Sequence, residues 1–202
     1  MAHGFTGRHF NPGRFTGNLS GQQSGSNPWV RPADWLALTT PGPADQRMVG
    51  LAAVFDSDSN FVTVRASAAF KVDWGDGAGW NLYAANTTAE KNLAWADYSS
   101  ATLTSRGYRQ AVVQVEPQSG NLTGLALQYR HSNAPATATT SSVWLDLRIA
   151  CTGTPTITGN SLQWTPAILE QAEITSPVNA PAHLFRNCSS LQQIPALDSS
   201  AG

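Results

Sequence analysis

Apolar side chains along this chain recur mostly at alternate positions or in short continuous runs. In residues 69–74, Phe70 and Val72 would lie on one face of a strand, and Lys71 and Asp73 on the other. Turn or loop segments rich in Gly, Pro, Asn or Ser separate further segments of this kind. The strands predicted in this way are 48–55, 61–67, 69–74, 108–117, 122–130, 143–151 and 161–165.

This succession of short strands and turns predicts a mainly β protein, with an antiparallel β-sandwich over residues 48–175. Residues 87–98 alone hint at a different structure, either a short helix or an ordered loop. The Ser/Thr-rich tract 132–142 is typical of a solvated loop, and a fibre-like interface strand is the alternative interpretation.

Residues 1–28 have the composition of an extended arm. They are rich in Gly, Asn, Ser and Gln and contain no acidic residue, while Phe5, Phe10 and Phe15 recur every five residues. That spacing fits neither a helix nor a strand, and so few apolar groups cannot form a core alone. Two interpretations stay open: a disordered terminus, or a segment that becomes ordered on a neighbouring subunit, with Arg8 and Arg14 donating directional hydrogen bonds.

Residues 29–47 are expected to be a Pro/Trp-rich linker. Two prolines fix an extended entry, and Trp29 and Trp35 would anchor the segment to a partner. Residues 32–36 could form one helical turn, and the Pro-Gly-Pro sequence predicts a loop over 39–46.

Composition excludes several classes of protein. The 202 residues are 41% hydrophobic, enough for a packed core, but only 12% charged. The net charge of −1 provides no field that would attract nucleic acid or a membrane surface. We find neither a run of 18 apolar residues nor a secretory signal, so neither a membrane helix nor export is predicted. Arginine outnumbers lysine ten to two, which favours multi-donor contacts at interfaces.

The sequence 73–77, Asp-Trp-Gly-Asp-Gly, poses the main chemical question. Asp76-Gly77 is a strong turn dipeptide, and both Asp73 and Asp76 can accept backbone N–H bonds. A structural turn is therefore the favoured interpretation. A calcium site would need further oxygen ligands, for which Asp56 and Asp58 are the nearest acidic candidates. A catalytic carboxylate pair is disfavoured because no nucleophile or general-acid histidine accompanies it.

Other catalytic and metal-binding patterns are missing from the sequence. His3, His9, His131 and His183 are scattered, and we find no nucleophile elbow or phosphate-binding loop. We therefore expect no cofactor, no metal and no enzymatic activity. Without an export signal, free buried thiols are favoured over a Cys151–Cys188 disulfide. Five tryptophans could form a carbohydrate-binding face, although the core and subunit interfaces are favoured; they are Trp74, Trp80, Trp95, Trp144 and Trp164.

Two stretches resemble known families. "KVDWGDG" is similar to the turn of PKD-type β-sandwich domains, and "GYRQAVVQVEP" at 107–117 resembles a later strand of that family, with Val113 one place later than the simplest pattern. That resemblance implies a PKD/Ig-like sandwich in which Asp73, Trp74, Gly75, Asp76 and Gly77 shape the fold. Within a C-terminal segment expected over 176–202, residues 184–202 resemble the start of a cysteine-bearing leucine-rich repeat of bacterial surface proteins. The matching positions are Leu184, Phe185, Cys188, Ser190, Leu191, Ile194, Pro195 and Leu197.

The combination of arm, Pro/Trp segment, sandwich and repeat start resembles virion structural proteins of tailed bacteriophages, above all tail-fibre and tail-appendage proteins. The resemblance implies a homo-oligomer in the virion, released by lysis, whose arm binds a tail, collar, baseplate or capsid protein. A host-surface glycan would be a further ligand. The alternatives are a capsid decoration protein and a carbohydrate-binding module of a surface adhesin.

Overall fold

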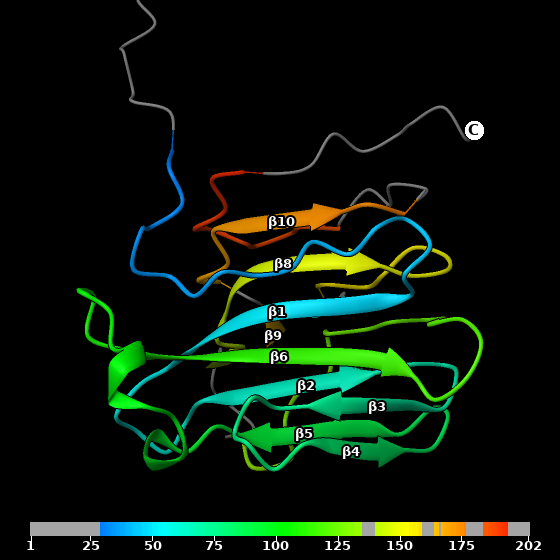
Figure 1. Ribbon diagram of the computed structural model, residues 1–202, viewed down its shortest axis with the longest axis horizontal. Helices are drawn as coiled ribbons and strands as arrows, with labels where there is room; N and C mark the ends of the chain where they lie inside the picture. The colour runs from blue at the N-terminus through cyan, green and yellow to red at the C-terminus, as the bar shows by residue number, and fades with distance from the viewer. Residues whose placement is uncertain (1–28, 135–139, 159–163, 166, 177–183, 194–202) are drawn as a thin grey trace, which may run out of the picture.

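The computed structural model describes residues 29–134, 140–158, 164–165, 167–176 and 184–193 (Figure 1). The mainly β prediction is confirmed: ten strands are found, and the helical elements of these residues are two 3₁₀ turns, Trp95–Asp97 and Ser100–Thr102. The strands are β1 (Arg47–Val54), β2 (Phe61–Arg65), β3 (Phe70–Asp73), β4 (Trp80–Tyr83), β5 (Thr88–Asn92), β6 (Arg109–Pro117), β7 (Thr140–Ser141), β8 (Trp144–Ala150), β9 (Trp164–Thr165) and β10 (Gln171–Ile174).

Six strands form the principal sheet, in the order β10-β8-β1-β6-β3-β4. Its neighbours are antiparallel except β8 and β10, which run parallel, as do β7 and β9 in a small separate pair. The expectation of a wholly antiparallel arrangement is therefore wrong at these two places. The reason is that the chain crosses from β8 to β10 through a long connection rather than a hairpin.

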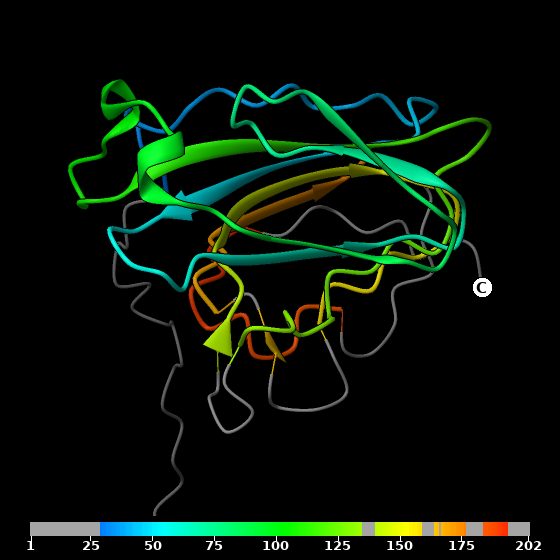
Figure 2. The same ribbon diagram turned by 90° about the horizontal axis from the view of Figure 1, so that it is seen from below.

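A second layer lies beneath the principal sheet and is built around β2 and β5 (Figure 2). The predicted strand 122–130 contributes here, but only as an irregular segment with isolated bridges. The Arg65 and Ala126 backbones bond to each other, at 2.9 and 2.8 Å, and Leu127 N donates to Thr156 O at 2.8 Å. Backbone hydrogen bonds thus extend the second layer without regular strands.

The core fills the space between the layers. Large side chains that are almost completely buried come from both layers and the loops between them; they include Met48, Leu51, Phe70, Trp74, Leu93, Leu122, Leu125, Leu127, Trp144, Leu147 and Ile149. Gly50 of β1 makes room for one of them, since a Cβ there would lie 2.5 Å from the ring of Trp144.

Three short elements differ from the sequence-based expectation. The segment 87–98, expected as a helix or ordered loop, contains β5 and a single 3₁₀ turn, because Ala89 is buried and its strand pairs with β2. Strands β4 and β10 were not predicted. Each is only four residues long, too short for alternation to be distinguished from a loop.

Candidate interaction surfaces

The turn between β3 and β4 is held by side-chain-to-backbone hydrogen bonds. Asp73 Oδ1 accepts the N–H of Gly75 at 2.9 Å, and Asp76 Oδ1 accepts the N–H of Ala78 at 3.0 Å. Gly75 and Gly77 have φ values of +73° and +80°, a region that only glycine enters at little cost. Both carboxylates therefore make the backbone contacts that the sequence predicts for a structural turn.

Trp74 and Gly75 connect this turn to the rest of the domain. The Trp74 side chain is buried, and its backbone carbonyl accepts a hydrogen bond from the Tyr98 hydroxyl at 3.0 Å. Burial raises the pKa of Tyr98, so the hydroxyl keeps its proton and donates. A Cβ on Gly75 would lie 2.5 Å from the Val112 carbonyl oxygen on β6, so the turn lies directly against the sheet.

The second oxygen of Asp76 is neutralised within the chain. Asp76 Oδ2 lies 2.8 Å from Lys91 Nζ, and this hydrogen bond lowers the pKa of the carboxyl group. Across the described ranges, no three His, Cys, Asp or Glu side chains gather as metal ligands would. Asp56 and Asp58 line a different pocket, described below.

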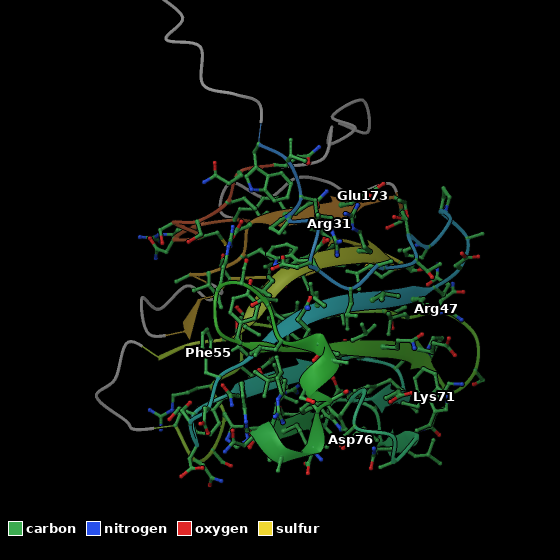
Figure 3. All side chains as sticks on the ribbon, turned by 60° about the vertical axis from the view of Figure 1, so that its left-hand side comes forward. Arg31, Arg47, Phe55, Lys71, Asp76 and Glu173 are labelled. Atoms are coloured by element: carbon green, nitrogen blue, oxygen red, sulfur yellow. The ribbon has the colours of Figure 1, made fainter. Side chains whose placement is uncertain are left out.

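Residues 29–46, here called the strap, run along the outer face of the principal sheet, on the side opposite β2 and β5 (Figure 2). Arg31 fixes the strap: its Nε lies 2.9 Å from Asp146 Oδ2, and its other nitrogens donate to the carbonyls of Trp35 and Leu36. Asp146 on β8 is completely buried. The strap also reaches β10, where Glu173 accepts a hydrogen bond from Thr40 at 3.3 Å (Figure 3).

The two strap tryptophans pack within the chain itself. Trp35 is only 5% exposed, and its Nε1 donates to the Tyr108 hydroxyl at 2.8 Å. Trp29 is partly buried, and its Nε1 donates to Glu170 at 3.2 Å, beside the ion pair of Glu170 with Arg106. The expected role of Trp35 as a partner-binding residue is thus corrected: its ring anchors the strap. The other predicted arm residues, Phe5, Arg8, Phe10, Arg14 and Phe15, lie outside the described residues.

The two edges of the principal sheet differ. The β10 edge is covered in part by residues 190–193: Gln192 N donates to Glu170 O at 2.9 Å, and Ala172 N donates to Gln193 O at 3.3 Å. At β4, no segment among the described residues pairs with the outer side. This edge strand exposes Trp80 (40%) and Leu82 (69%), and Lys71 Nζ lies 4.3 Å from the Trp80 ring centroid.

A pocket of about 440 Å³ lies between the β1–β2 loop and the loop after β5. Its lining residues are Asp56, Ser57, Asp58, Ala94, Trp95 and Ala96. Phe55, at the start of the first loop, is labelled in Figure 3. The sequence placed Asp56 and Asp58 in a turn, but it could not show that Trp95 would stand beside them.

The segment 184–193 buries two of the predicted repeat positions. Leu184 is 5% and Cys188 9% exposed, while Phe185 and Leu191 pack against the same core from partly buried positions. Ile194, Pro195 and Leu197 lie outside the described residues. Residues 184–187 form turns, and Cys188 N donates to Phe185 O at 3.3 Å.

Both cysteines are free and buried, as predicted. Burial raises the pKa of Cys151 to about 11 and that of Cys188 to about 12, so both thiols are protonated and unreactive near neutral pH. His131 is also buried, stacked on Phe61 with ring centroids 4.5 Å apart, and burial lowers its pKa so that it is neutral. His3, His9 and His183 lie outside the described residues.

The tryptophans whose side chains the structure describes do not form one continuous carbohydrate-binding face. Trp74 and Trp144 are core residues, while Trp80 and Trp95 reach the surface at separate places. The side chain of Trp164 lies outside the described structure.

Comparisons with known proteins assign no family. No family model matches the chain, and neither the curated proteins nor the solved structures contain a significant match. Within the described ranges, no helix has the length and apolar character needed to span a membrane.

Proposed function

We propose that this chain is a non-enzymatic structural component of a bacteriophage virion, of the tail-fibre or tail-appendage type, anchored through residues 1–28 to a tail, collar or baseplate protein. The sequence resemblance supports the virion assignment. The two layers support a PKD/Ig-like sandwich, and the buried Leu184 and Cys188 support the start of a leucine-rich-repeat-like turn.

The observation that carries this proposal is that the strap, which follows the arm in the chain, is held on the domain by its side chains. Arg31 joins the strap to the buried Asp146, and Trp29 and Trp35 hold the strap at Glu170 and Tyr108. Force applied to the arm would therefore be transmitted to β8, the second strand from one edge of the principal sheet. An arm that serves as an anchor needs such an attachment, whereas an unused terminus does not.

The entropy cost of ordering the arm has to be offset by contacts with a partner. Fixing a backbone costs about 1–2 kcal/mol per residue, whereas three buried Phe side chains contribute at most about 9 kcal/mol together. Backbone pairing with the neighbouring protein must supply the rest. We therefore infer strand addition or a lacing path, with Arg8 and Arg14 donating to partner carbonyls or carboxylates.

The deciding experiment removes residues 1–28 and measures the copy number of the protein in assembled particles. The truncated domain should remain folded, because residues of the strap and of both layers bury their apolar side chains against one another in a single core. Incorporation into particles should be lost. Normal incorporation would contradict the proposal. Cryo-electron microscopy of particles with the full chain would separate a tail position from a capsid decoration role.

We further propose β4 as the contact between copies in a homo-oligomer. Its outer side carries no described partner, and Leu82 projects an apolar side chain beside it. Leu82→Lys should lower the mass measured by light scattering, while circular dichroism should show that the separated protomer keeps its β structure. Val30→Lys is the matched control, since Val30 is 78% exposed and belongs to the strap rather than to a sheet edge.

A further inference from the structure

We propose that the pocket formed by Asp56, Ser57, Asp58 and Trp95 binds a neutral saccharide. This role goes beyond anchoring and does not depend on it. Four features of the pocket support this proposal: a fixed loop, unpaired carboxylates, an oriented indole ring, and the absence of lining groups suited to other ligands.

The β1–β2 loop is held in one conformation by Asn60, which is completely buried. Asn60 Oδ1 accepts the N–H of Phe55 at 2.9 Å, and its Nδ2 lies 2.8 to 3.0 Å from the carbonyl oxygens of Phe55, Ser57 and Leu93. Asn92 Nδ2 donates to the carbonyl of Asp58 at 2.8 Å. The loop therefore presents its side chains from a pre-organised backbone, which reduces the entropy cost of binding.

The carboxylates on this loop have no partners among the described residues. Among the described acidic side chains, only Asp56, Asp58 and Asp97 take part in no hydrogen bond or ion pair; the others, such as Asp76 and Glu170, each make at least one. Asp56 and Asp58 thus keep their full capacity to accept hydrogen bonds. Charge-assisted bonds from hydroxyl donors are short and strong.

The opposite wall is an indole with a fixed orientation. The Arg109 guanidinium lies 4.2 Å from the Trp95 ring centroid and donates to the Trp95 carbonyl at 2.7 Å and to the Tyr98 carbonyl at 2.8 Å. Trp95 is partly exposed, and the small side chains of Ala94 and Ala96 line the pocket with it. An aromatic surface beside hydrogen-bond acceptors matches a sugar, which has C–H groups on one face and hydroxyls at its rim.

Other ligand classes fit this pocket less well. Among the described residues no cationic side chain lines it, so an anion would meet only the repulsion of Asp56 and Asp58. A calcium ion needs six to eight oxygen ligands, and the Asn60 side-chain oxygen that could add to those of Asp56 and Asp58 already accepts the Phe55 N–H. A cationic ligand would be repelled by the Arg109 guanidinium, which lies 4.2 Å from the Trp95 ring centroid, whereas a neutral saccharide would not be.

The test uses the full chain on an array of bacterial surface polysaccharides, followed by calorimetric titration of each oligosaccharide that binds. Asp56→Ala and Asp58→Ala should each weaken binding by about tenfold, since each removes a charge-assisted bond. Both variants should keep the wild-type melting temperature, because neither side chain has a partner within the described structure. Trp80→Ala, which removes an exposed tryptophan outside the pocket, should bind like the wild type.

Three results would overturn the proposal. The first is an array on which no saccharide binds. The second is binding that survives the double change of Asp56 and Asp58 to alanine, whatever the effect of Trp80→Ala. The third is a rise in melting temperature with calcium chloride or spermidine that requires Asp56 and Asp58, found while no saccharide binds. Loss of virion incorporation on deleting residues 1–28 tests the anchoring role separately and leaves this result unaffected.

Discussion

Gly75 and Gly77 offer a direct test of how the turn between β3 and β4 is built. Both have a positive φ, +73° and +80°. A Cβ on Gly75 would lie 2.5 Å from the Val112 carbonyl oxygen, whereas a Cβ on Gly77 would have no atom within 4 Å. The two alanine variants therefore share the backbone strain and differ only in the contact with β6.

The magnitudes follow from that difference. A left-handed conformation costs an L-residue about 1–2 kcal/mol, so Gly77→Ala should lower the free energy of unfolding by that amount. Gly75→Ala carries the same cost and an overpacking cost of about 1–3 kcal/mol, because the clashing atom belongs to a strand backbone inside the sheet. Each kcal/mol lowers the melting temperature of a domain of this size by about 2–4 °C.

Urea denaturation at 25 °C, followed by tryptophan fluorescence and by circular dichroism, would measure both variants. Coincident transitions by the two probes are required before the free energies are compared. Gly75→Ala should be the less stable variant by about 1–3 kcal/mol. Equal losses in the two variants would show that the close approach to Val112 does not constrain the turn, and our reasoning about its structural role would be refuted.

Asp76→Ala should lower the free energy of unfolding by roughly 1–2 kcal/mol at pH 7, and calcium should leave the melting temperature unchanged. Because the pKa of Asp76 is lower in the folded state, its carboxylate should stabilise the fold fully above the unfolded pKa of about 3.9. This stabilisation should be lost as the pH falls through the lower, folded pKa. Cys188→Ala should be tolerated with a small loss and Cys188→Ser with a larger one, while non-reducing mass spectrometry should find no disulfide. Arg31→Lys should lower the free energy of unfolding, measured by urea denaturation, by about 2 kcal/mol, because a lysine cannot contact Asp146 and the strap carbonyls together. An unchanged denaturation midpoint would contradict the interpretation that Arg31 fixes the strap.

Several features could be predicted because their causes are local. Alternation along 69–74 predicted β3, since side chains of a strand point to opposite faces whatever the strand pairs with. The Asp-Gly turn was predictable because Asp73 and Asp76 bond to backbone groups only two residues away.

The interaction surfaces could not be predicted in the same way. Lys91 pairs with Asp76 across 15 residues, and Arg31 pairs with Asp146 across 115. Trp95 joins Asp56 and Asp58 in one pocket only because β2 and β5 pair and bring the two loops together.

The sequence by itself determined that this protein is mainly β, where most of its longer strands lie, and that its Asp-Gly turn is closed by its own side chains. Only the tertiary structure decided that β10 runs parallel to β8, that Trp35 is buried, and that β4 is left without a described partner. The physical reason is range. Backbone preference and alternation act over a few residues. Strand order and burial depend on contacts between segments far apart in the chain, and a local sequence pattern does not determine the free energies of those contacts.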